Sequence, residues 1–553
     1  SMLRWCLFLS LATAVVASST PNPIYDASQY TTVVDKVPNG ILYAVRAPES
    51  THLPVLHVFG TAKERGMAQG QLLGDDILDF VENKLDEFYR EEVDSIPLGL
   101  LPEWLQKAIK GLGKDLAPAA FHLALGFVWD EQLKYNSASA AGIVDEIAGM
   151  AAGICMNRTS PYCHEGGKKL TRTLEHVNML PELIRMQCSM MGAWGKATPN
   201  GKLVQLRSLD FGAGPFANRS LLVVHHPPSP AQAFASLGFP ALVGIVTGFS
   251  ESISQCEKVD DVSGGHSPKG TYAGQAATMV IRDMVQFAKS KEEAVAIAQK
   301  AHRTWPVWLG LGDYSSQEFV AMLYEEASAN TYTDKTLPTL TNQTQFDDVA
   351  YLDKHPQPSE HPDMPALVAQ YYGNITPDIV ASYFPRLMES GDVHIAVYDF
   401  QNNRTLIATG TTDAVGQFTR FAHEAPFLQF DNAKLWSEPA PPAPPVVCAA
   451  NQFCCPEAKH CLTPSNVSCA DSADACSPSE TCCPVTKICV TVGKPCESPC
   501  SSAKAYCCPE ALHCLTPNHP GKFCGTASAC SPGSVCCPIT NLCTSIGAPC
   551  VPP

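Results

Sequence analysis

The sequence is poor in basic residues and in long apolar runs. Its 38 Lys and Arg residues are outnumbered by 54 Asp and Glu residues, which gives a formal net charge of −16. Because proteins bind nucleic acid through basic surfaces, this balance argues against a nucleic-acid partner. Beyond the amino-terminal segment, no apolar run approaches the roughly 20 residues that a membrane-spanning helix needs. We therefore expect no transmembrane helix.

Cysteine is also scarce through most of the chain, because only five of the 25 cysteines precede Cys448. Two of these five, Cys155 and Cys163, bracket Asn157, and no second pair of ligands lies near them at zinc-like spacing. We expect a local disulfide between these two cysteines. The sequence predicts no bound metal ion and no cofactor.

Two features indicate the secretory pathway. Residues 1–17 combine one positive charge, a short apolar run and small residues near Ala17, which is typical of a signal peptide. Six Asn-x-Ser/Thr sequons follow, and this number favours glycosylated surface loops. The sequons lie at Asn157, Asn218, Asn342, Asn374, Asn403 and Asn466. We expect a secreted or lysosomal protein.

The remaining 20 cysteines form a duplicated pattern in the last part of the chain. Residues 437–447 are rich in proline and predict a stiff linker. Residues 448–496 and 500–550 then carry ten cysteines each and share the sequence Cys-Cys-Pro-Glu-Ala-x-His-Cys-Leu-Thr-Pro. An even count in so small a unit predicts a disulfide-stapled module. We expect this tail to contact a membrane surface, a glycan or another protein.

A hairpin is predicted in the middle of the chain. Asn200-Gly201 is a strong turn signal, and strand-like runs flank it on both sides. Cys188 would start the first strand, and Arg207 and Asp210 would lie at the end of its partner. Because a hairpin brings its two open ends together, the pattern predicts a thiol, a guanidinium and a carboxylate at one corner.

These residue types suit catalysis by a thiol nucleophile. A nearby cation stabilises the reactive thiolate, and the Arg207 guanidinium cannot compete for the proton. If the chain is cut between Gln187 and Cys188, the new α-amine, with an ordinary pKa of about 8, can act as the base. Asp210 would orient this amine. A lone cysteine in a secreted protein is more often buried or in a disulfide, so the prediction depends on all three residues together.

The Cys-Ser at 188–189, followed by Arg-Ser-Leu-Asp at 207–210, resembles the N-terminal nucleophile (Ntn) cysteine hydrolases. This superfamily includes acid ceramidase and N-acylethanolamine acid amidase. The nearest resemblance is to the peptidase C45 group, which contains acyl-CoA:6-aminopenicillanic acid acyltransferase. It extends in patches from Val55 to Gly410. The resemblance implies an α+β fold with a four-layer αββα core, and self-cleavage of the Gln187–Cys188 bond.

The resemblance also divides the chain into parts. Residues 18–187 would be a helical pro-segment or small subunit and residues 188–436 the catalytic subunit, so that cleavage yields an α/β heterodimer. Family members carry an asparagine where this chain has Ser250, and many place an oxyanion-binding asparagine where it has Trp308. Ser250 and Asn330 are therefore the candidate donors to an oxyanion.

Apolar residues recur at helical spacing through residues 75–91 and 98–128. One interpretation is a pair of helices that face the core. The other is an exposed apolar surface that meets lipid or a lipid-presenting partner.

Three shorter patterns predict structure and not chemistry. Gly66 and Gly70, four residues apart, predict a helix packed closely on a sheet. His225 and His226 predict the exposed face of a strand. Residues 334–365, rich in proline and threonine, predict loops.

The sequence thus predicts a self-processing cysteine amidohydrolase. Cys188 would attack the acyl carbonyl of an N-acylated lipid or small molecule, and water would resolve the thioester. One alternative is a phospholipase B-like ester hydrolase or an acyltransferase on the same fold, which a comparison of amide and ester substrates would distinguish. Another is a secreted Cys-rich binding protein with an inactive front domain, which a Cys188→Ala variant would distinguish.

Overall fold

The computed structural model describes residues 20–442, except 113–115, 185–186, 212–215, 217, 260–269, 339–343, 355–363 and 414–415, and short strands beyond residue 443. The predicted signal peptide and the sequons at Asn342 and Asn466 lie outside the described residues. The chain divides into two compact units, Ser1–Pro442 and Ala443–Pro553.

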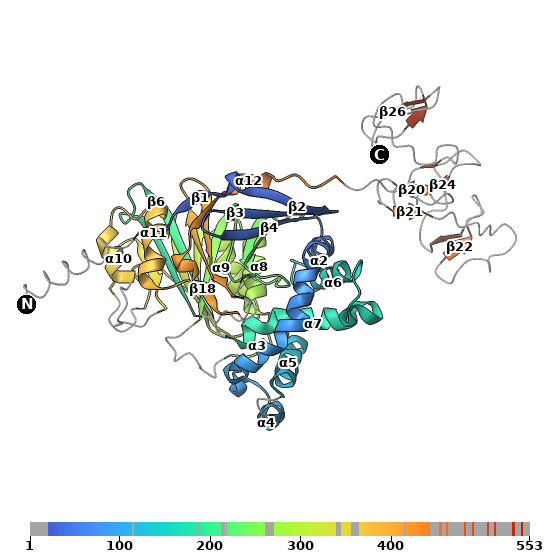
Figure 1. Ribbon diagram of the computed structural model, residues 1–553, viewed down its shortest axis with the longest axis horizontal. Coiled ribbons are helices and arrows are strands. Elements are labelled where there is room, and N and C mark those ends of the chain that lie inside the picture. Colours follow the sequence, from blue (N-terminus) through green and yellow to red (C-terminus); the bar gives the residue numbers. More distant parts are fainter. Residues whose placement is uncertain are drawn as a thin grey trace, which may run out of the picture. The chain divides into compact units, whose positions relative to one another are not determined.

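Two β-sheets form the centre of the first unit (Figure 1). The seven-stranded sheet has the order β1 (Ile24–Asp26), β19 (Phe427–Asp431), β16 (Arg404–Thr409), β15 (His394–Asp399), β6 (Gly201–Asp210), β5 (Gln187–Gly195) and β14 (Val349–Leu352). The ten-stranded sheet has the order β13 (Ala329–Tyr332), β12 (Phe319–Tyr324), β11 (Val307–Asp313), β10 (Ile253–Val259), β9 (Gly248–Ser250), β8 (Phe234–Gly238), β7 (Leu221–His226), β4 (Thr51–Phe59), β3 (Gly40–Ala47) and β2 (Thr31–Val37).

Buried apolar clusters show that the sheets and helices are stacked in layers. One cluster joins Met190 and Leu203 of the seven-stranded sheet to Leu222 and Phe319 of the ten-stranded sheet, so the two sheets pack face to face. Helices α10 and α11 cover the outside of the first sheet, and α8 and α9 cover the second. These helices are α8 (Ala277–Phe287), α9 (Lys291–Lys300), α10 (Met364–Tyr371) and α11 (Pro377–Met388). The predicted α+β class is confirmed, and the layer order is helix–sheet–sheet–helix.

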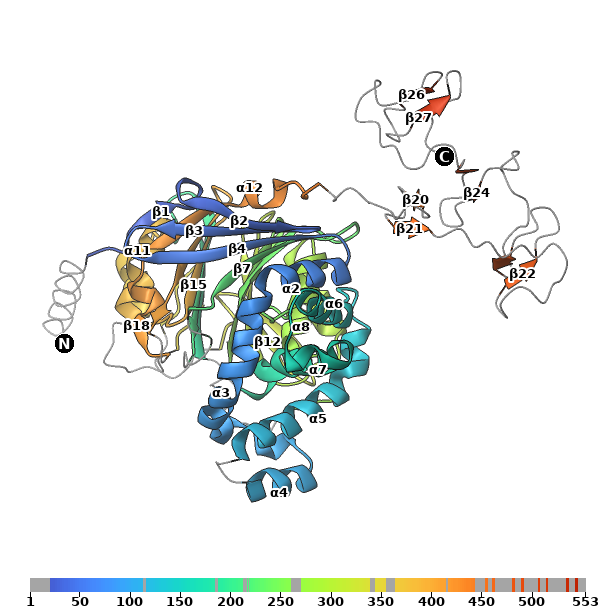
Figure 2. The same cartoon turned by 45° about the vertical axis from the view of Figure 1, so that its right-hand side comes forward.

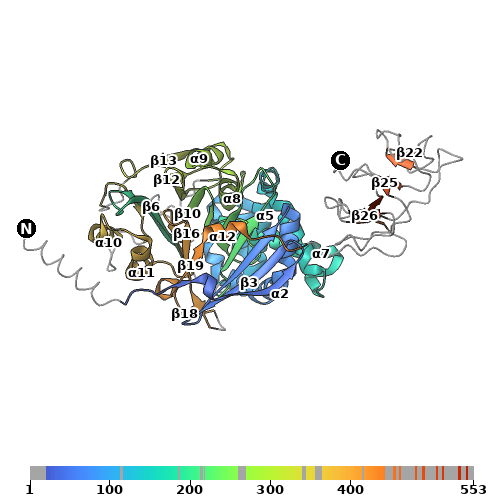
Figure 3. The same cartoon turned by 90° about the horizontal axis from the view of Figure 1, so that it is seen from above.

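Further helices gather outside the ten-stranded sheet, on the opposite side of the strands from α10 and α11 (Figure 3). They are α2 (Ala62–Asp79), α3 (Leu85–Glu92), α4 (Glu103–Leu112), α5 (Ala117–Ser137), α6 (Ile143–Cys155) and α7 (His164–Leu183). Figure 2 shows α4 at the far end of this group. Leu105, Ile109 and Phe121 are buried, as a core-facing helix pair requires, whereas Trp104 is 63% exposed. Cys155, at the end of α6, forms a disulfide with Cys163.

Residues 18–187 are not helical throughout, as predicted for a helical pro-segment, because they contribute strands to both sheets. β4 lies between β3 and β7 and pairs in parallel with β7, which follows Cys188 in the sequence. β1 pairs with β19, near the end of the first unit. The helical apolar spacing at 75–128 indicated the helices of this segment, while its strands lie earlier, within residues 24–59. This segment is therefore an integral part of one fold.

Gly66 and Gly70 pack against another helix and not against a sheet, which corrects the prediction. A Cβ atom on Gly66 would lie 1.9 Å from the Glu146 carbonyl oxygen, and one on Gly70 would lie 2.1 Å from that of Met150. Both carbonyls belong to α6, on which Gly149 makes the reciprocal approach to α2. Helices α2 and α6 thus meet backbone to backbone, because small residues line both faces.

Two local predictions need correction. His225 is buried at 3% exposure rather than on an exposed face, and its ring stacks on Phe234 of the neighbouring strand β8. His226 is half-buried, and its Nε2 lies 3.0 Å from His57 Nδ1 on the neighbouring strand. Within residues 334–365, predicted as loops, β14 forms an edge strand that pairs with β5.

The described residues of the second unit form four short antiparallel strand pairs. They are β20 (Phe453–Cys455) with β21 (His460–Leu462), β22 (Glu480–Cys482) with β23 (Cys489–Thr491), β24 (Tyr506–Cys507) with β25 (Cys514–Leu515), and β26 (Ser534–Cys536) with β27 (Cys543–Ser545). The pairing of Cys454 with Cys461 recurs as Cys507 with Cys514. The duplicated sequence therefore forms duplicated hairpins. The predicted disulfides of this unit fall on side chains outside the described ones.

Candidate active site

Strands β5 and β6 form a hairpin, which confirms the prediction made from the turn signal. They pair antiparallel, with Gln187 opposite Asp210 and Cys188 opposite Leu209. Gly201 closes the turn with a φ of +74°, a conformation that glycine adopts without steric cost. The two open ends of the hairpin therefore lie side by side.

Cys188 and Arg207 share the face that points toward the ten-stranded sheet. The thiol of Cys188, which is fully buried, lies 4.0 Å from Glu257 Oε2 and donates toward it. Arg207 Nη2 donates to the same oxygen at 3.3 Å. Glu257 comes from β10, so the facing sheet supplies a carboxylate that links the predicted nucleophile to the predicted cation.

Further contacts fix the Arg207 guanidinium. Its Nε donates to Thr247 Oγ1 at 3.0 Å, and its Nη1 donates to the Ser208 carbonyl at 2.8 Å. Thr247 Oγ1 also lies 3.0 Å from His394 Nε2. Because Arg207 and His394 are both fully buried, this network holds the guanidinium in one orientation beside Cys188.

Burial controls the titration of these groups. It raises the pKa of the Cys188 thiol to about 12; Arg207 opposes this rise, and Glu257 adds to it. Burial also lowers the pKa of His394 well below its ordinary value, and the charge of Arg207 lowers it further. In the uncut chain the thiol is therefore protonated and the imidazole neutral at physiological pH.

Asp210 lies at the same strand end but on the other face of the sheet, because side chains alternate along a strand. Its Oδ1 accepts from Lys354 Nζ and from the Gly391 backbone N–H, each at 2.7 Å. Its Oδ2 accepts from Ser390 Oγ at 2.8 Å. Asp210 is thus held next to the Gln187–Cys188 peptide bond, while Glu257 is the carboxylate on the face of the thiol.

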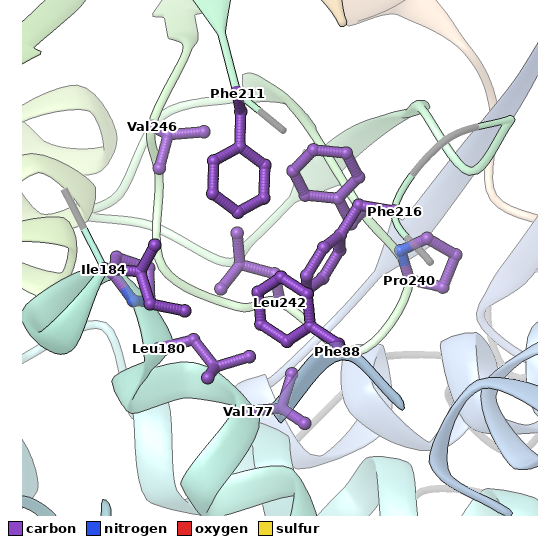
Figure 4. A pocket seen from close by; sticks show the side chains of 11 residues that line it. Phe88, Val177, Leu180, Ile184, Phe211, Phe216, Pro240, Leu242 and Val246 are labelled. Atoms are coloured by element: carbon purple, nitrogen blue, oxygen red, sulfur yellow. The ribbon is translucent and has the colours of Figure 1, made fainter. Parts of the chain in front are cut away.

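An apolar pocket adjoins the hairpin ends (Figure 4). It is lined by Phe88, Val177, Leu180, Pro181, Ile184, Phe211, Phe216, Phe239, Pro240, Leu242 and Val246. The carbonyl of Val246 accepts from Arg207 Nη2 at 3.4 Å, and Phe211 directly follows Asp210 in the sequence. Ile184 belongs to the segment that leads into Cys188. A purely apolar chamber therefore borders the polar cluster.

The two candidate oxyanion donors lie in other surroundings. Ser250 Oγ accepts from Gln232 Nε2 at 3.0 Å and donates to the Ile253 carbonyl at 3.4 Å, which fixes it in the turn between β9 and β10. Asn330 lies on the edge strand β13, where its exposed side chain donates to Ser328 Oγ at 3.0 Å. The structure does not bring either amide or hydroxyl into the Cys188 cluster, so the geometry does not support these two assignments.

Four of the six sequons fall on described residues, and all four asparagines are exposed: Asn157, Asn218, Asn374 and Asn403. Asn218 also donates its amide to the Thr412 carbonyl at 2.7 Å. Among the described residues, no three His, Cys, Asp or Glu side chains are arranged to hold a metal ion. No helix of that part of the chain is both long and apolar enough to cross a membrane.

Sequence reasoning missed Glu257, Lys354 and Ser390. Glu257 stands in a buried strand with no motif around it, and Lys354 follows a strand within a segment predicted as loop. Each residue reaches the hairpin from a distant part of the sequence. Only Lys354 could have been found from the sequence, because it is a charged residue just after the apolar run that forms β14.

No protein-family model matches the sequence. Two solved structures are similar at low identity. The Caenorhabditis elegans ortholog of N-acylethanolamine-hydrolyzing acid amidase is 12% identical with a TM-score of 0.26, covering 38% of this chain and 93% of that chain. Penicillin V acylase from Agrobacterium tumefaciens is 13% identical with a TM-score of 0.28, covering 46% of this chain and 89% of that chain.

Sequence similarity is stronger to two proteins of Dictyostelium discoideum. Protein dcd1A is 29% identical over 434 residues, which cover 74% of this chain and 90% of dcd1A. Protein dcd1B is 31% identical over 432 residues, which cover 74% of this chain and 79% of dcd1B. Identity at this level across most of both proteins shows common descent, and the chain belongs to the family of dcd1A and dcd1B.

Proposed function

We propose that this protein is a self-processing cysteine amidase of the Ntn superfamily that cleaves a non-peptide amide in an N-acylated lipid or small molecule. One observation supports this best. Cys188 is the second residue of β5, and Arg207 on the paired strand lies on the same buried face, joined to it through Glu257. A thiol beside a fixed guanidinium is suited to nucleophilic attack once the proton is removed.

Self-cleavage uses the contacts of the uncut chain. The Cys188 thiol gives its proton to Glu257, and the sulfur adds to the carbonyl carbon of Gln187. The C–N bond of the Gln187–Cys188 peptide then breaks as the nitrogen takes up a proton, which leaves a thioester. Water hydrolyses the thioester, so that Gln187 ends in a carboxylate and Cys188 gains a free thiol and a free α-amine.

Turnover then uses the new α-amine as the base. It accepts the thiol proton while the sulfur adds to the acyl carbonyl of the substrate, and it returns the proton to the departing amine. Arg207 stabilises the thiolate and Asp210, opposite residue 187, orients the α-amine. Water attacks the acyl thioester, which releases a carboxylic acid and restores the thiol.

The apolar pocket supports an apolar acyl group. Its eleven lining residues are all apolar, and the rings of Phe88, Phe211 and Phe216 point toward one another across it (Figure 4). A hydrocarbon chain gains free energy by leaving water for such a chamber. Ile184, in the segment before the proposed cut, forms part of the wall, so cleavage would free one side of the pocket.

The test is the Cys188→Ala variant, with Cys256→Ala as its matched control. Both cysteines are fully buried and neither is in a disulfide. Intact mass spectrometry should show two polypeptides for the wild type and for the Cys256 variant, and one unbroken chain for Cys188→Ala. Hydrolysis of a long-chain N-acyl amide should disappear in that variant alone. Processing or hydrolysis that persists in Cys188→Ala would overturn the proposal.

We also propose that the protein enters the secretory pathway. The exposure of the four described sequon asparagines supports this, because the glycan-transferring enzyme needs access to the side chain. Treatment of the protein from a eukaryotic host with an N-glycosidase should lower its mass, and an unchanged mass would contradict the proposal.

A further inference from the structure

A polar cavity lies next to Asp210, on the side of the sheet away from the Cys188 thiol. Its walls include Lys354, Asp392 and His423, with Arg386, Glu389 and Glu424 around them. These residues come from the end of α11, the segment before β15, the segment after β14 and the turn before β19. None of them belongs to the thiol cluster, and none was singled out from the sequence.

Lys354 connects this cavity to Asp210. Its Nζ lies 2.7 Å from Asp210 Oδ1 and 3.9 Å from Asp392 Oδ1. Its backbone N–H donates to Ser189 Oγ at 3.0 Å, which ties it to the residue after the nucleophile. The side chain is only 13% exposed, so its ammonium is held in place between two carboxylates.

We propose that Lys354 is the positioning residue that orients Asp210 for the α-amine of Cys188, and that Asp392 competes with Asp210 for the Lys354 ammonium. This inference rests on the proposed self-processing function. Lys354 binds Asp210 on the face of the sheet opposite the Cys188 thiol. It acts through Asp210, whose remaining bonds come from Ser390 and the Gly391 backbone.

The competition makes the arrangement sensitive to pH. Burial raises the pKa of Asp392 to about 6, the charges of Asp210 and Glu389 add to the rise, and Lys354 opposes it. His423 Nδ1 also faces Asp392, at 3.7 Å, and Arg386 and Glu424 line the same cavity. Below about pH 6, Asp392 is neutral and Lys354 binds Asp210 alone. Above that pH the ionised Asp392 draws the ammonium away.

The first experiment compares Lys354→Met, Lys354→Arg and Lys335→Met in the full chain. Lys335 also pairs with two aspartates, Asp334 and Asp347, but on an exposed surface, so it serves as the matched control. Because a charged hydrogen bond contributes strongly to orientation, Lys354→Met should lower kcat roughly 10- to 100-fold with little change in KM. Self-cleavage, which uses Glu257 and precedes the α-amine, should proceed in this variant. Lys354→Arg should recover part of the loss, and Lys335→Met should match the wild type.

The second experiment measures the pH profile of Asp392→Asn, which keeps the shape of the side chain and removes its charge. The ratio of kcat in the variant to kcat in the wild type should rise as the pH rises through about 6, because only the wild type loses the Lys354–Asp210 contact. Taking the ratio cancels the titration of the α-amine, which the two proteins share. A ratio that stays constant through this interval, or a wild-type kcat in folded Lys354→Met, would overturn this inference and leave the proposed function intact if Cys188→Ala is inactive. Activity in Cys188→Ala would instead overturn the proposed function.

Discussion

Arg65 Nη2 on α2 lies 2.9 Å from Glu146 Oε2 on α6, and both side chains are almost fully buried. The same oxygen accepts from Arg282 Nη2 on α8 at 2.8 Å. Arg65 and Glu146 precede the Gln187–Cys188 bond, and Arg282 follows it. One carboxylate therefore neutralises two buried cations that belong to different sides of the proposed cut.

Replacing Glu146 with Ala should destabilise the protein strongly, because it leaves both guanidinium groups buried without a counter-charge. The expected loss is about 3–5 kcal/mol of unfolding free energy. Urea unfolding at neutral pH measures it. Asp75→Ala is the control, since Asp75 pairs with Arg158 at the surface and is 87% exposed, and it should cost less than about 1 kcal/mol. Equal losses in the two variants would contradict this account of the buried cluster.

Gly66→Ala should also lower stability, for a steric reason. The added Cβ would lie 1.9 Å from the Glu146 carbonyl oxygen, so α2 and α6 would have to separate. Overpacking of this kind costs about 1–3 kcal/mol or more. Gly111→Ala on α4 is the matched control, because nothing lies within 4 Å of its added Cβ. That variant should be neutral or stabilised by up to about 1 kcal/mol, in line with helix propensity.

Glu257→Gln should lower the pKa of the Cys188 thiol below its value of about 12, because the negative charge of Glu257 raises it. The thiolate absorbs in the near ultraviolet, so titration of each protein against a Cys188→Ser version isolates the signal of this thiol. The same change leaves Arg207 buried without its carboxylate, and thermal unfolding should occur at lower temperature. A thiol that titrates unchanged in a folded variant would argue against direct coupling.

His57 predicts a loss of stability in acid. Burial lowers its pKa from the ordinary value to about 3, and the neighbouring His226 contributes to this. Between about pH 3 and 6.5 the unfolded chain binds more protons at this residue than the folded chain, so stability rises with pH in that window and is lost as the pH falls. His57→Gln should reduce the slope of unfolding free energy against pH by up to about 1.4 kcal/mol per unit. An unchanged slope in His57→Gln would contradict this account.

The central hairpin was predictable because its information is local. Asn200-Gly201 marks the turn, although the loop spans residues 196–200 and the register shifts between Ala193 and Gly195. The sequence therefore predicted the hairpin, and the structure supplies its exact register. The contacts of Cys188 and Asp210 were not predictable, because Glu257 lies 69 positions from Cys188, and Lys354 lies 144 positions from Asp210. The hydrophobic periodicity of a sequence does not indicate which distant strand will lie beside a given residue.

Gly66 and Gly70 also show that local sequence does not identify a distant packing partner. Their spacing correctly indicated a close approach by α2, since only residues without a Cβ permit it. It gave no information on the partner, and α6 occupies the place where a sheet was expected. Strand β2 was not predicted for a related reason: it is exposed on both faces and lacks the alternation that marks a half-buried strand.

The parallel neighbours β4 and β7, and β1 and β19, come from opposite sides of the Gln187–Cys188 bond. Cleavage of that bond would therefore not separate the two polypeptides, because strands of one would remain paired with strands of the other in both sheets. Such a protein should migrate as a single species in a native gel and as two bands after denaturation. Refolding either band alone should fail, because each piece lacks strands that the other one provides.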